Sequence, residues 1–302
     1  MKVAVVLPST PGLVQTRVAD YLQLMRPRLA LLVLATVGTG WLLAAGELHW
    51  LSLVYALIGT ALLFGGASAL NQLLERHRDA LMPRTANRPL PAGRLQPVEV
   101  LVLGSILSVG GLACLLALSP PLAAGLGVFA LFSYVLVYTP LKERTPLSTL
   151  IGAVPGAVPP LIGWAAARGS LDGGAMVLFL IVFLWQVPHF LAIAWIYRDQ
   201  YARAGIQVLP VVDPQCLQTR RAMIGYTLVL ILASLLPFVL GLGGWLSGLG
   251  ALVLGAVFLY TVLVFARTGT IHEARRVFRS SLVFLSALFL LFVLDALLVH
   301  GM

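Results

Sequence analysis

Long apolar runs separated by short polar breaks are the main pattern of this chain. Many of the runs reach the ~20 residues that an α-helix needs to cross the hydrocarbon core of a bilayer. Their apolar positions do not alternate with polar ones, so the pattern does not fit a membrane β-barrel. We predict nine transmembrane helices at 29–46, 51–74, 98–118, 122–140, 147–167, 174–197, 222–241, 245–266 and 281–299.

The composition agrees with an all-α integral membrane protein. Of the 302 residues, 60% are hydrophobic and 10% charged, and the mean hydropathy is +0.97. These values exclude an ordinary soluble domain. Cys114 and Cys216 have no spacing that suggests a metal site or a disulfide framework. We expect residues 1–28 to form a cytoplasmic tail and 29–299 to form one nine-helix domain.

The basic residues lie almost entirely on one side of the predicted spans. Of the 20 Lys and Arg, 19 fall in the N-terminus or in four segments on the same side, 75–97, 142–144, 198–221 and 267–279, and the exception is Arg168. The positive-inside rule then places the N-terminus in the cytoplasm and the C-terminus on the opposite side of the cell (inner) membrane. For any one loop the cations could serve topology alone, and "HEARRVFRS" at 272–280 is interpreted as such a topology signal in a loop.

One charged stretch has a regular spacing of polar residues, which a topology signal does not require. Asn71, Glu75 and Asp79 recur every four residues, so they share one helix face within roughly 80°. Carboxylate and amide oxygens are ligands that Mg²⁺ prefers, often together with substrate phosphate oxygens. The second span is therefore expected to run past the membrane boundary and to present a metal-binding face.

Arginines surround this face. Guanidinium groups match phosphate geometry, which together with the acids favours a metal-bridged diphosphate site. Pro83, Pro89 and Pro91 are expected to end the helix and to aim the following loop back at the carboxylates. The alternative is a helix end stabilised by i,i+4 ion pairs. The basic residues concerned are Arg76, Arg78, Arg84 and Arg88.

At this point the sequence resembles a known family. "NQLLERHRDALMPRTANRP" (71–89) is similar to the signature of the UbiA superfamily of intramembrane prenyltransferases, in its haem O synthase branch. Further similar stretches are "YLQLMRPRLALLVL" (21–34), "YTPLKERTPLSTLIGAVPGAVPPLIGW" (138–164) and "WQVPHFLAIAWIYRDQYARAGIQVLP" (185–210). The resemblance implies nine helices around a central cavity and transfer of a farnesyl group from farnesyl diphosphate to a vinyl group of haem b.

The second charged stretch departs from the family pattern. Where the branch usually has an acid directly before Tyr201, this chain has Gln200, with Asp199 one position earlier. One position is a 100° rotation on a helix, so Asp199 and Gln200 remain alternative oxygen donors for a second metal site.

The resemblance also implies roles for other residues. Mg²⁺ would be held by Asn71, Glu75 and Asp79 with help from Asp199, and its charge would help the diphosphate to leave. Aromatic faces could stabilise an allylic cation, although bundle packing or an interfacial belt explains them as well. The diphosphate-binding candidates are Arg76, Arg84, Arg88, Lys142, Arg144 and Arg198, and the aromatic candidates are Tyr134, Tyr138 and Trp164.

His189, after Pro188 in the sixth span, is a further candidate, because an ionisable side chain in a membrane helix is costly. It could contact the haem iron, deprotonate the water that adds to the product, or be a neutral histidine satisfied by a neighbouring helix.

Two other functions stay open. A related prenyltransferase could act on an aromatic quinone precursor, and a transporter of an anionic substrate could line its path with arginines. The resemblance favours haem b and farnesyl diphosphate as substrates in the lipid bilayer, with a haem A synthase or an oxidase assembly protein as a possible partner. No nucleic-acid partner is expected.

Overall fold

The computed structural model describes residues 13–46 and 49–300, which form helices and, in these ranges, no strand. Helix α1 (Leu13–Met25) precedes α2 (Pro27–Ala44). Between them Arg26 adopts a left-handed conformation (φ 49°), which breaks the helix. The predicted N-terminal tail is therefore helical from residue 13 to 25, while its residues 1–12 lie outside the described residues.

Helix α1 is tied to the bundle by polar contacts. Ser68 Oγ and Gln72 Nε2 donate to the Leu24 carbonyl at 2.8 and 2.9 Å. An ion pair of 2.9 Å joins Asp20 to Arg94. This segment thus packs on the bundle.

Nine helical segments within the described residues are long and apolar enough to cross a membrane, which confirms the predicted number of spans. The first is formed by α1 and α2. The others consist of α3 (Trp50–Asp79); α4 (Pro97–Leu118); α5 (Pro121–Phe132), η1 (Ser133–Tyr138) and α6 (Thr139–Leu141); α7 (Ser148–Gly156) and α8 (Pro159–Arg168); α9 (Gly173–Ile196); α12 (Leu217–Val239); α13 (Trp245–Thr268); and α14 (Ile271–His300). Short helices α10 (Arg198–Arg203) and α11 (Leu209–Val212) lie between α9 and α12.

The last span begins ten residues earlier than predicted. Helix α14 starts at Ile271, so the predicted loop over 267–279 is wrong, and only two residues separate α13 from α14. The sequence has neither Pro nor Gly between 271 and 300. Ala274, Val277 and Ser281 are fully buried at helical spacing, which holds the charged first turns against the bundle.

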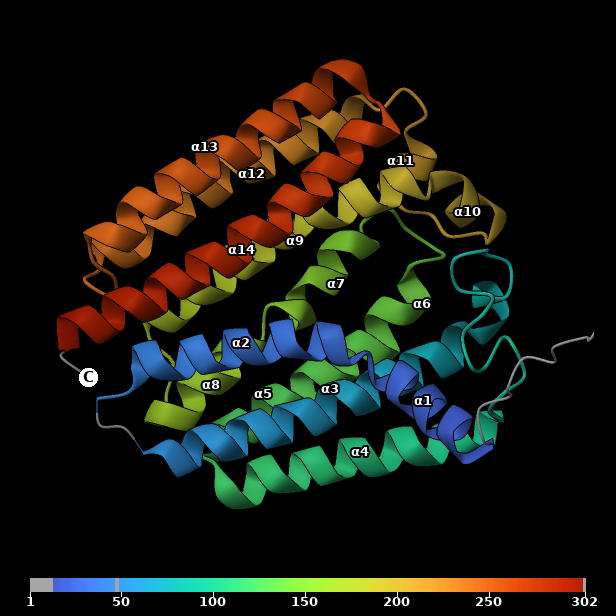
Figure 1. The fold of residues 1–302 in the computed structure, drawn as a ribbon, viewed down its shortest axis with the longest axis horizontal. Helices are drawn as coiled ribbons and strands as arrows, with labels where there is room; N and C mark the ends of the chain where they lie inside the picture. The colour runs from blue at the N-terminus through green and yellow to red at the C-terminus, as the bar shows by residue number, and fades with distance from the viewer. Residues whose placement is uncertain (1–12, 47–48, 301–302) are drawn as a thin grey trace, which may run out of the picture.

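The helices close into a ring. Helix α2 packs on α3 and α8, the C-terminal helices α9, α12, α13 and α14 pack on one another, and α14 also contacts α2. The approach of α2 to α8 requires glycine, because a Cβ on Gly40 would lie 2.2 Å from the Pro160 carbonyl oxygen. Helix α1 and the end of α14 lie at opposite ends of the bundle (Figure 1).

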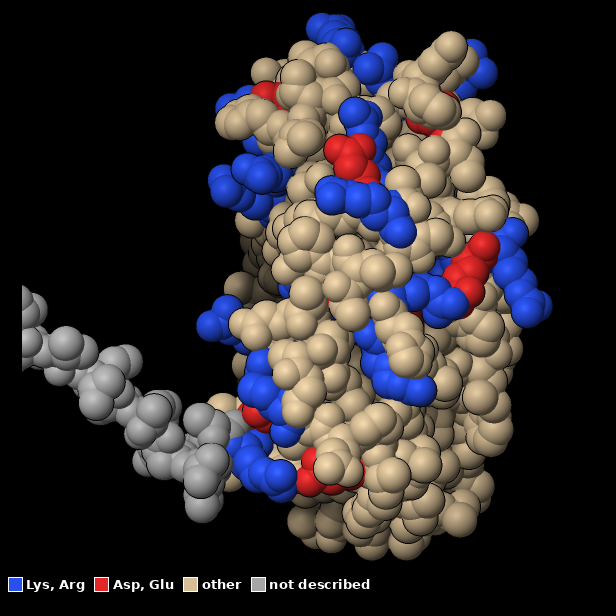
Figure 2. Space-filling model, turned by 90° about the vertical axis from the view of Figure 1, so that its right-hand side faces the viewer, with Lys and Arg blue, Asp and Glu red and all other residues tan. Residues whose placement is uncertain are grey.

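Lys and Arg side chains gather at the end of the bundle that carries α10 and α11 (Figure 2). This end includes the C-terminus of α3 and the loop that follows it, which form the site described next.

Candidate active site

The last turns of α3 present the polar face expected from the sequence. Asn71 and Asp79 are each only 1% exposed. Asn71 Nδ2 donates to Thr139 Oγ1 of α6 at 3.0 Å, which fixes the amide. An amide and two carboxylates therefore lie side by side on α3 with little access to bulk water.

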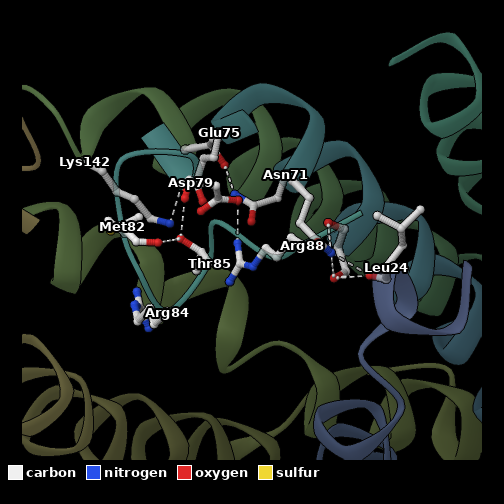
Figure 3. A network of polar contacts seen from close by, with 12 residues as sticks. Leu24, Asn71, Glu75, Asp79, Met82, Arg84, Thr85, Arg88 and Lys142 are labelled. Carbon is white, nitrogen blue, oxygen red and sulfur yellow. Dashed lines mark hydrogen bonds and ion pairs between the residues drawn. The ribbon is translucent and has the colours of Figure 1, made fainter. Parts of the chain in front are cut away.

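Each carboxylate on this face is paired with one cation. Lys142 Nζ lies 2.6 Å from Glu75 Oε1, and Arg88 Nη1 lies 2.6 Å from Asp79 Oδ2 (Figure 3). The side chain of Asp79 is 2% exposed, which makes this pair the more buried of the two. The end of α3, the loop 80–96 that follows it and the distant segment after α6 thus meet in one cluster of acids and bases.

The electrostatics of the two cations favour binding of an anion. Burial opposes the charge of Lys142, but the Glu75 carboxylate and the Tyr138 ring outweigh it and raise the pKa of this amine above its ordinary range. For Arg88, burial and the nearby Arg26 guanidinium lower the pKa of the guanidinium, although Asp79 opposes both effects. Positive charges are thus held close together beside the carboxylates.

A π-helix shapes the aromatic wall of the cluster. Residues Ser133–Tyr138 form the wider helix η1, and Thr139 Oγ1 donates to the Tyr134 carbonyl at 2.9 Å. The rings of Tyr134 and Tyr138 are 5.5 Å apart, and Lys142 Nζ lies 4.4 Å from the centroid of the Tyr138 ring. Single π-helical turns are frequent at functional sites. Both tyrosines predicted to line the site are therefore next to it.

The loop 80–96 carries Arg88 to its expected place but directs Arg84 elsewhere. Arg84 Nη2 donates to the Tyr201 hydroxyl at 2.7 Å, and its guanidinium carbon lies 4.9 Å from the ring centroids of both Tyr197 and Tyr201. Gln200 Oε1 accepts from the Arg84 backbone N–H at 3.5 Å. Arg84 thus clamps the loop onto α10 and does not reach the carboxylates.

Several predicted phosphate or metal ligands lie outside the cluster. Arg76 donates to the Leu73 carbonyl of its own helix at 3.0 Å, and Arg144 is exposed. Arg198 lies over the Trp195 ring, 4.3 Å from its centroid. The Asp199 side chain is 81% exposed and contacts Arg198 at 3.6 Å. The one-position shift noted in the sequence therefore turns this acid outward, whereas Gln200 faces the loop.

His189 and Trp164 are also placed away from the carboxylates. His189 faces α14, where its Nδ1 lies 2.8 Å from Ser281 Oγ, and its ring stacks on Trp185 at 4.6 Å. This geometry favours the neutral histidine held by a neighbouring helix. Trp164 is fully buried near the opposite end of the bundle, 5.5 Å from Arg168. Helix α9 continues through Pro188 without a break.

Sequence reasoning missed residues that hold the site in place. Thr139 orients Asn71. Thr85 belongs to the loop that was expected to turn back to the carboxylates, and its Oγ1 donates to the Asp79 backbone carbonyl at 2.9 Å, which closes the turn after α3. Tyr201 receives Arg84. The available signal was that Thr139 stands next to Pro140 and Thr85 stands two positions after Pro83. A proline removes a backbone donor, which leaves nearby carbonyls to accept hydrogen bonds from side-chain hydroxyls.

The donor set fits Mg²⁺. The described residues contain no cluster of three or more His, Cys, Asp or Glu able to enclose a metal. Mg²⁺ needs no such cage, because it is usually bound through one or two carboxylates, waters and substrate phosphates. One buried and one partly buried carboxylate, with a buried amide, match that chemistry at the basic end of the bundle.

Solved structures share this fold. One, described as digeranylgeranylglyceryl phosphate synthase, aligns with a TM-score of 0.77 at 17% identity, covering 93% of this chain and 99% of that one. A UbiA homologue from Archaeoglobus fulgidus, bound to DMAPP and Mg²⁺, aligns with a TM-score of 0.64 at 15% identity over 90% of this chain and 99% of that one. The class is thus a polytopic α-helical membrane protein with the fold of intramembrane prenyltransferases.

The sequence comparisons are more specific. The UbiA prenyltransferase family profile matches residues 31–292. A protein named protoheme IX farnesyltransferase from Solibacter usitatus is 46% identical over 286 residues, which cover 91% of this chain and 98% of that protein. One of the same name from Opitutus terrae is 40% identical, covering 96% and 97%. The chain belongs to the UbiA prenyltransferase family.

Proposed function

We propose that this chain transfers the farnesyl group of farnesyl diphosphate to a vinyl group of haem b, which gives haem O and diphosphate. The structural observation that carries the proposal is the two largely buried ion pairs, Glu75 with Lys142 and Asp79 with Arg88, beside the buried Asn71 at the basic end of the bundle. Relatives at 40–46% identity bear the name protoheme IX farnesyltransferase, which supports this choice of substrates.

The α3 face and its cations would share the task of holding the diphosphate. Asn71, Glu75 and Asp79 would hold Mg²⁺, which when bound supplies positive charge next to the leaving group. Lys142 and Arg88 already lie at the carboxylates, so each can exchange its acid partner for a phosphate oxygen. Arg84 keeps the loop that carries Arg88 docked on α10, which makes it a positioning residue.

The chemical step would break the C–O bond of farnesyl diphosphate, and the bonding electron pair would leave with the diphosphate. The vinyl π electrons of haem b would then form the new C–C bond to the allylic carbon. Water adds to the resulting cation and loses one proton. Tyr138 and Tyr134 lie at the cluster, where their ring faces can stabilise positive charge by about 0.5–2 kcal/mol.

Apolar substrates would enter from the bilayer. A groove of about 520 Å³ runs between α2 and α14, lined mainly by Leu, Val and aromatic side chains such as Trp41, Trp50 and Phe289. Such a groove suits a farnesyl chain or the edge of a porphyrin. His189 faces α14 and contacts Ser281, so we leave it out of the reacting groups.

The orientation follows from the charges. We place the basic end in the cytoplasm and the C-terminus on the other side of the inner membrane, because basic loops are retained on the cytoplasmic side. A product as apolar as haem O would pass within the membrane to a haem A synthase or an oxidase assembly protein.

The test is a product analysis. Purified full-length protein with Mg²⁺, haem b and farnesyl diphosphate is expected to give a haem adduct of the hydroxyethyl-farnesyl mass, and omission of Mg²⁺ should abolish it. Parallel reactions contain hydroxybenzoate or a naphthoate in place of haem. Prenylation of these aromatic acids without any haem adduct would reject the proposed acceptor.

A further inference from the structure

A second polar site lies between the last two helices, apart from the carboxylate cluster. Side chains of α13 and α14 line a groove of about 390 Å³. The cluster is built from α3, α6 and the loop 80–96, none of which lines this groove. Any ligand of the groove is therefore independent of the diphosphate site and of the proposed reaction.

The chemistry of the groove changes in order along the helices. Arg276 and Arg279 lie in the first turns of α14, near the basic end. Deeper in the span, Thr261 Oγ1 and Ser280 Oγ lie 2.8 Å apart. Val283 follows about 10 Å beyond Arg276, at 1.5 Å of rise per residue, and is 60% exposed. Along α14, charge, a hydroxyl group and an apolar surface thus succeed one another from the membrane boundary inward, while on α13 Val264 lies on the boundary side of Thr261.

The positive charge at the membrane-boundary end of the groove is only partly neutralised by acidic side chains. Glu273 accepts an ion pair from Arg276 at 3.2 Å and contacts His272 at 3.7 Å. Arg279 is exposed, and within the described ranges no carboxylate lies within ion-pair distance of it. The groove therefore has a guanidinium available for an anion, with a second one shared with Glu273.

We propose that this groove holds one anionic glycerophospholipid from the leaflet at the basic end. Its phosphate would lie at Arg279 and Arg276, its ester oxygens at the hydroxyls of Ser280 and Thr261, and one acyl chain along the exposed valines. The order of the groove matches the order of groups in such a lipid, and the excess positive charge selects an anionic headgroup. A soluble anion would leave the apolar half unused.

Lipid selectivity of the purified full-length protein tests the proposal. Native mass spectrometry is performed with phosphatidylglycerol and phosphatidylcholine of the same acyl chains, and preferential retention of one phosphatidylglycerol is expected. The double variant Arg276→Gln with Arg279→Gln should weaken that retention roughly 25-fold, at about five-fold per arginine. The control is Arg221→Gln, an exposed arginine in the first turns of α12, which should retain the lipid like the wild type.

A second variant separates a lipid groove from a charged surface. Val283→Trp fills the apolar part without changing any charge and, at a 60% exposed position, leaves the core intact. It is expected to lose the bound phosphatidylglycerol although both arginines remain. Unchanged selectivity in the double variant would overturn the proposal, as would full retention in Val283→Trp or displacement of the lipid by millimolar inorganic phosphate.

Discussion

The end of α3 and helix α10 are both charged segments that follow a transmembrane helix at the same end of the bundle, but they differ in burial. Asp79 is 1% exposed and is paired with an arginine from a loop that folds back over it. On α10, the Asp199 side chain is 81% exposed and contacts its neighbour Arg198. Both stretches contain two arginines and at least one acid, so the presence of these residue types does not distinguish them.

The difference shows what makes a charged stretch a reaction centre. A buried carboxylate with a cationic partner interacts in a low dielectric and keeps its geometry, whereas an exposed pair is screened by water and contributes little. Helix α10 contributes instead through Tyr201 and Gln200, which hold the loop 80–96. We infer that α3 supplies the reacting groups and α10 supplies their support.

Substitution of the buried acid should have the largest effect. Asp79→Asn removes one charge from the proposed Mg²⁺ site and leaves Arg88 unpaired, so kcat of farnesyl transfer is expected to fall by about 10²–10³-fold. The matched control, Asp199→Asn, should stay within about three-fold of the wild type, because an exposed pair is screened. Comparable losses in the two variants would contradict the contrast between α3 and α10.

Lys142 should show an intermediate effect. Lys142→Met leaves Glu75 without its cation and removes a phosphate partner, so kcat/KM for farnesyl diphosphate should fall by roughly 10–100-fold. The pKa of Lys142 is raised above its unfolded value of ~10.4, so its charge is fully present below that value and is lost only as the pH rises beyond it. The ratio of turnover by wild type and Lys142→Arg should accordingly stay constant between about pH 7 and pH 9. A ratio that changes within this window would show that Lys142 loses its proton there.

The support from α10 should give the smallest effect. Tyr201→Phe keeps the ring beside Arg84 but removes the hydroxyl that accepts its hydrogen bond, a loss of about 0.5–1.5 kcal/mol in loop docking. Turnover is expected to fall a few-fold, with greater protease sensitivity of the loop 80–96. Tyr197→Phe, whose ring contacts the same guanidinium, serves as the control and should match the wild type. A loss as large as that of Asp79→Asn would place Tyr201 among the reacting groups.

Local periodicity was sufficient to predict the helical half of the site. The four-residue spacing of Asn71, Glu75 and Asp79 placed them on one face, and the structure has α3 continuing to Asp79. The nine spans were predictable for the same reason, because an apolar stretch of the required length is a local property of the chain. The predicted start of the last span was wrong, because it was placed after a run of charged residues with no other helix-ending signal. Charged residues can continue an amphipathic helix, and α14 includes them.

Partners across the fold could not be predicted in this way. Glu75 meets Lys142 from 67 positions away, and His189 meets Ser281 from 92 positions away. The spacing of residues along the chain does not predict such pairs, because these contacts depend on how the helices pack. Arg84 was expected at the carboxylates because the prolines were predicted to turn its loop back toward them, but Tyr197, just before α10, and Tyr201 within it offer its guanidinium two aromatic faces and a hydroxyl.

The contact of α14 with α2 has a consequence for biosynthesis. Chains are made and inserted from the N-terminus, so the ring remains open until the final helix arrives. The carboxylate cluster, however, draws its ion pairs from residues between 75 and 142, all of which precede the fifth span. The nascent protein can therefore form these ion pairs before α10, which holds the loop 80–96, and the closing helix α14 have been translated.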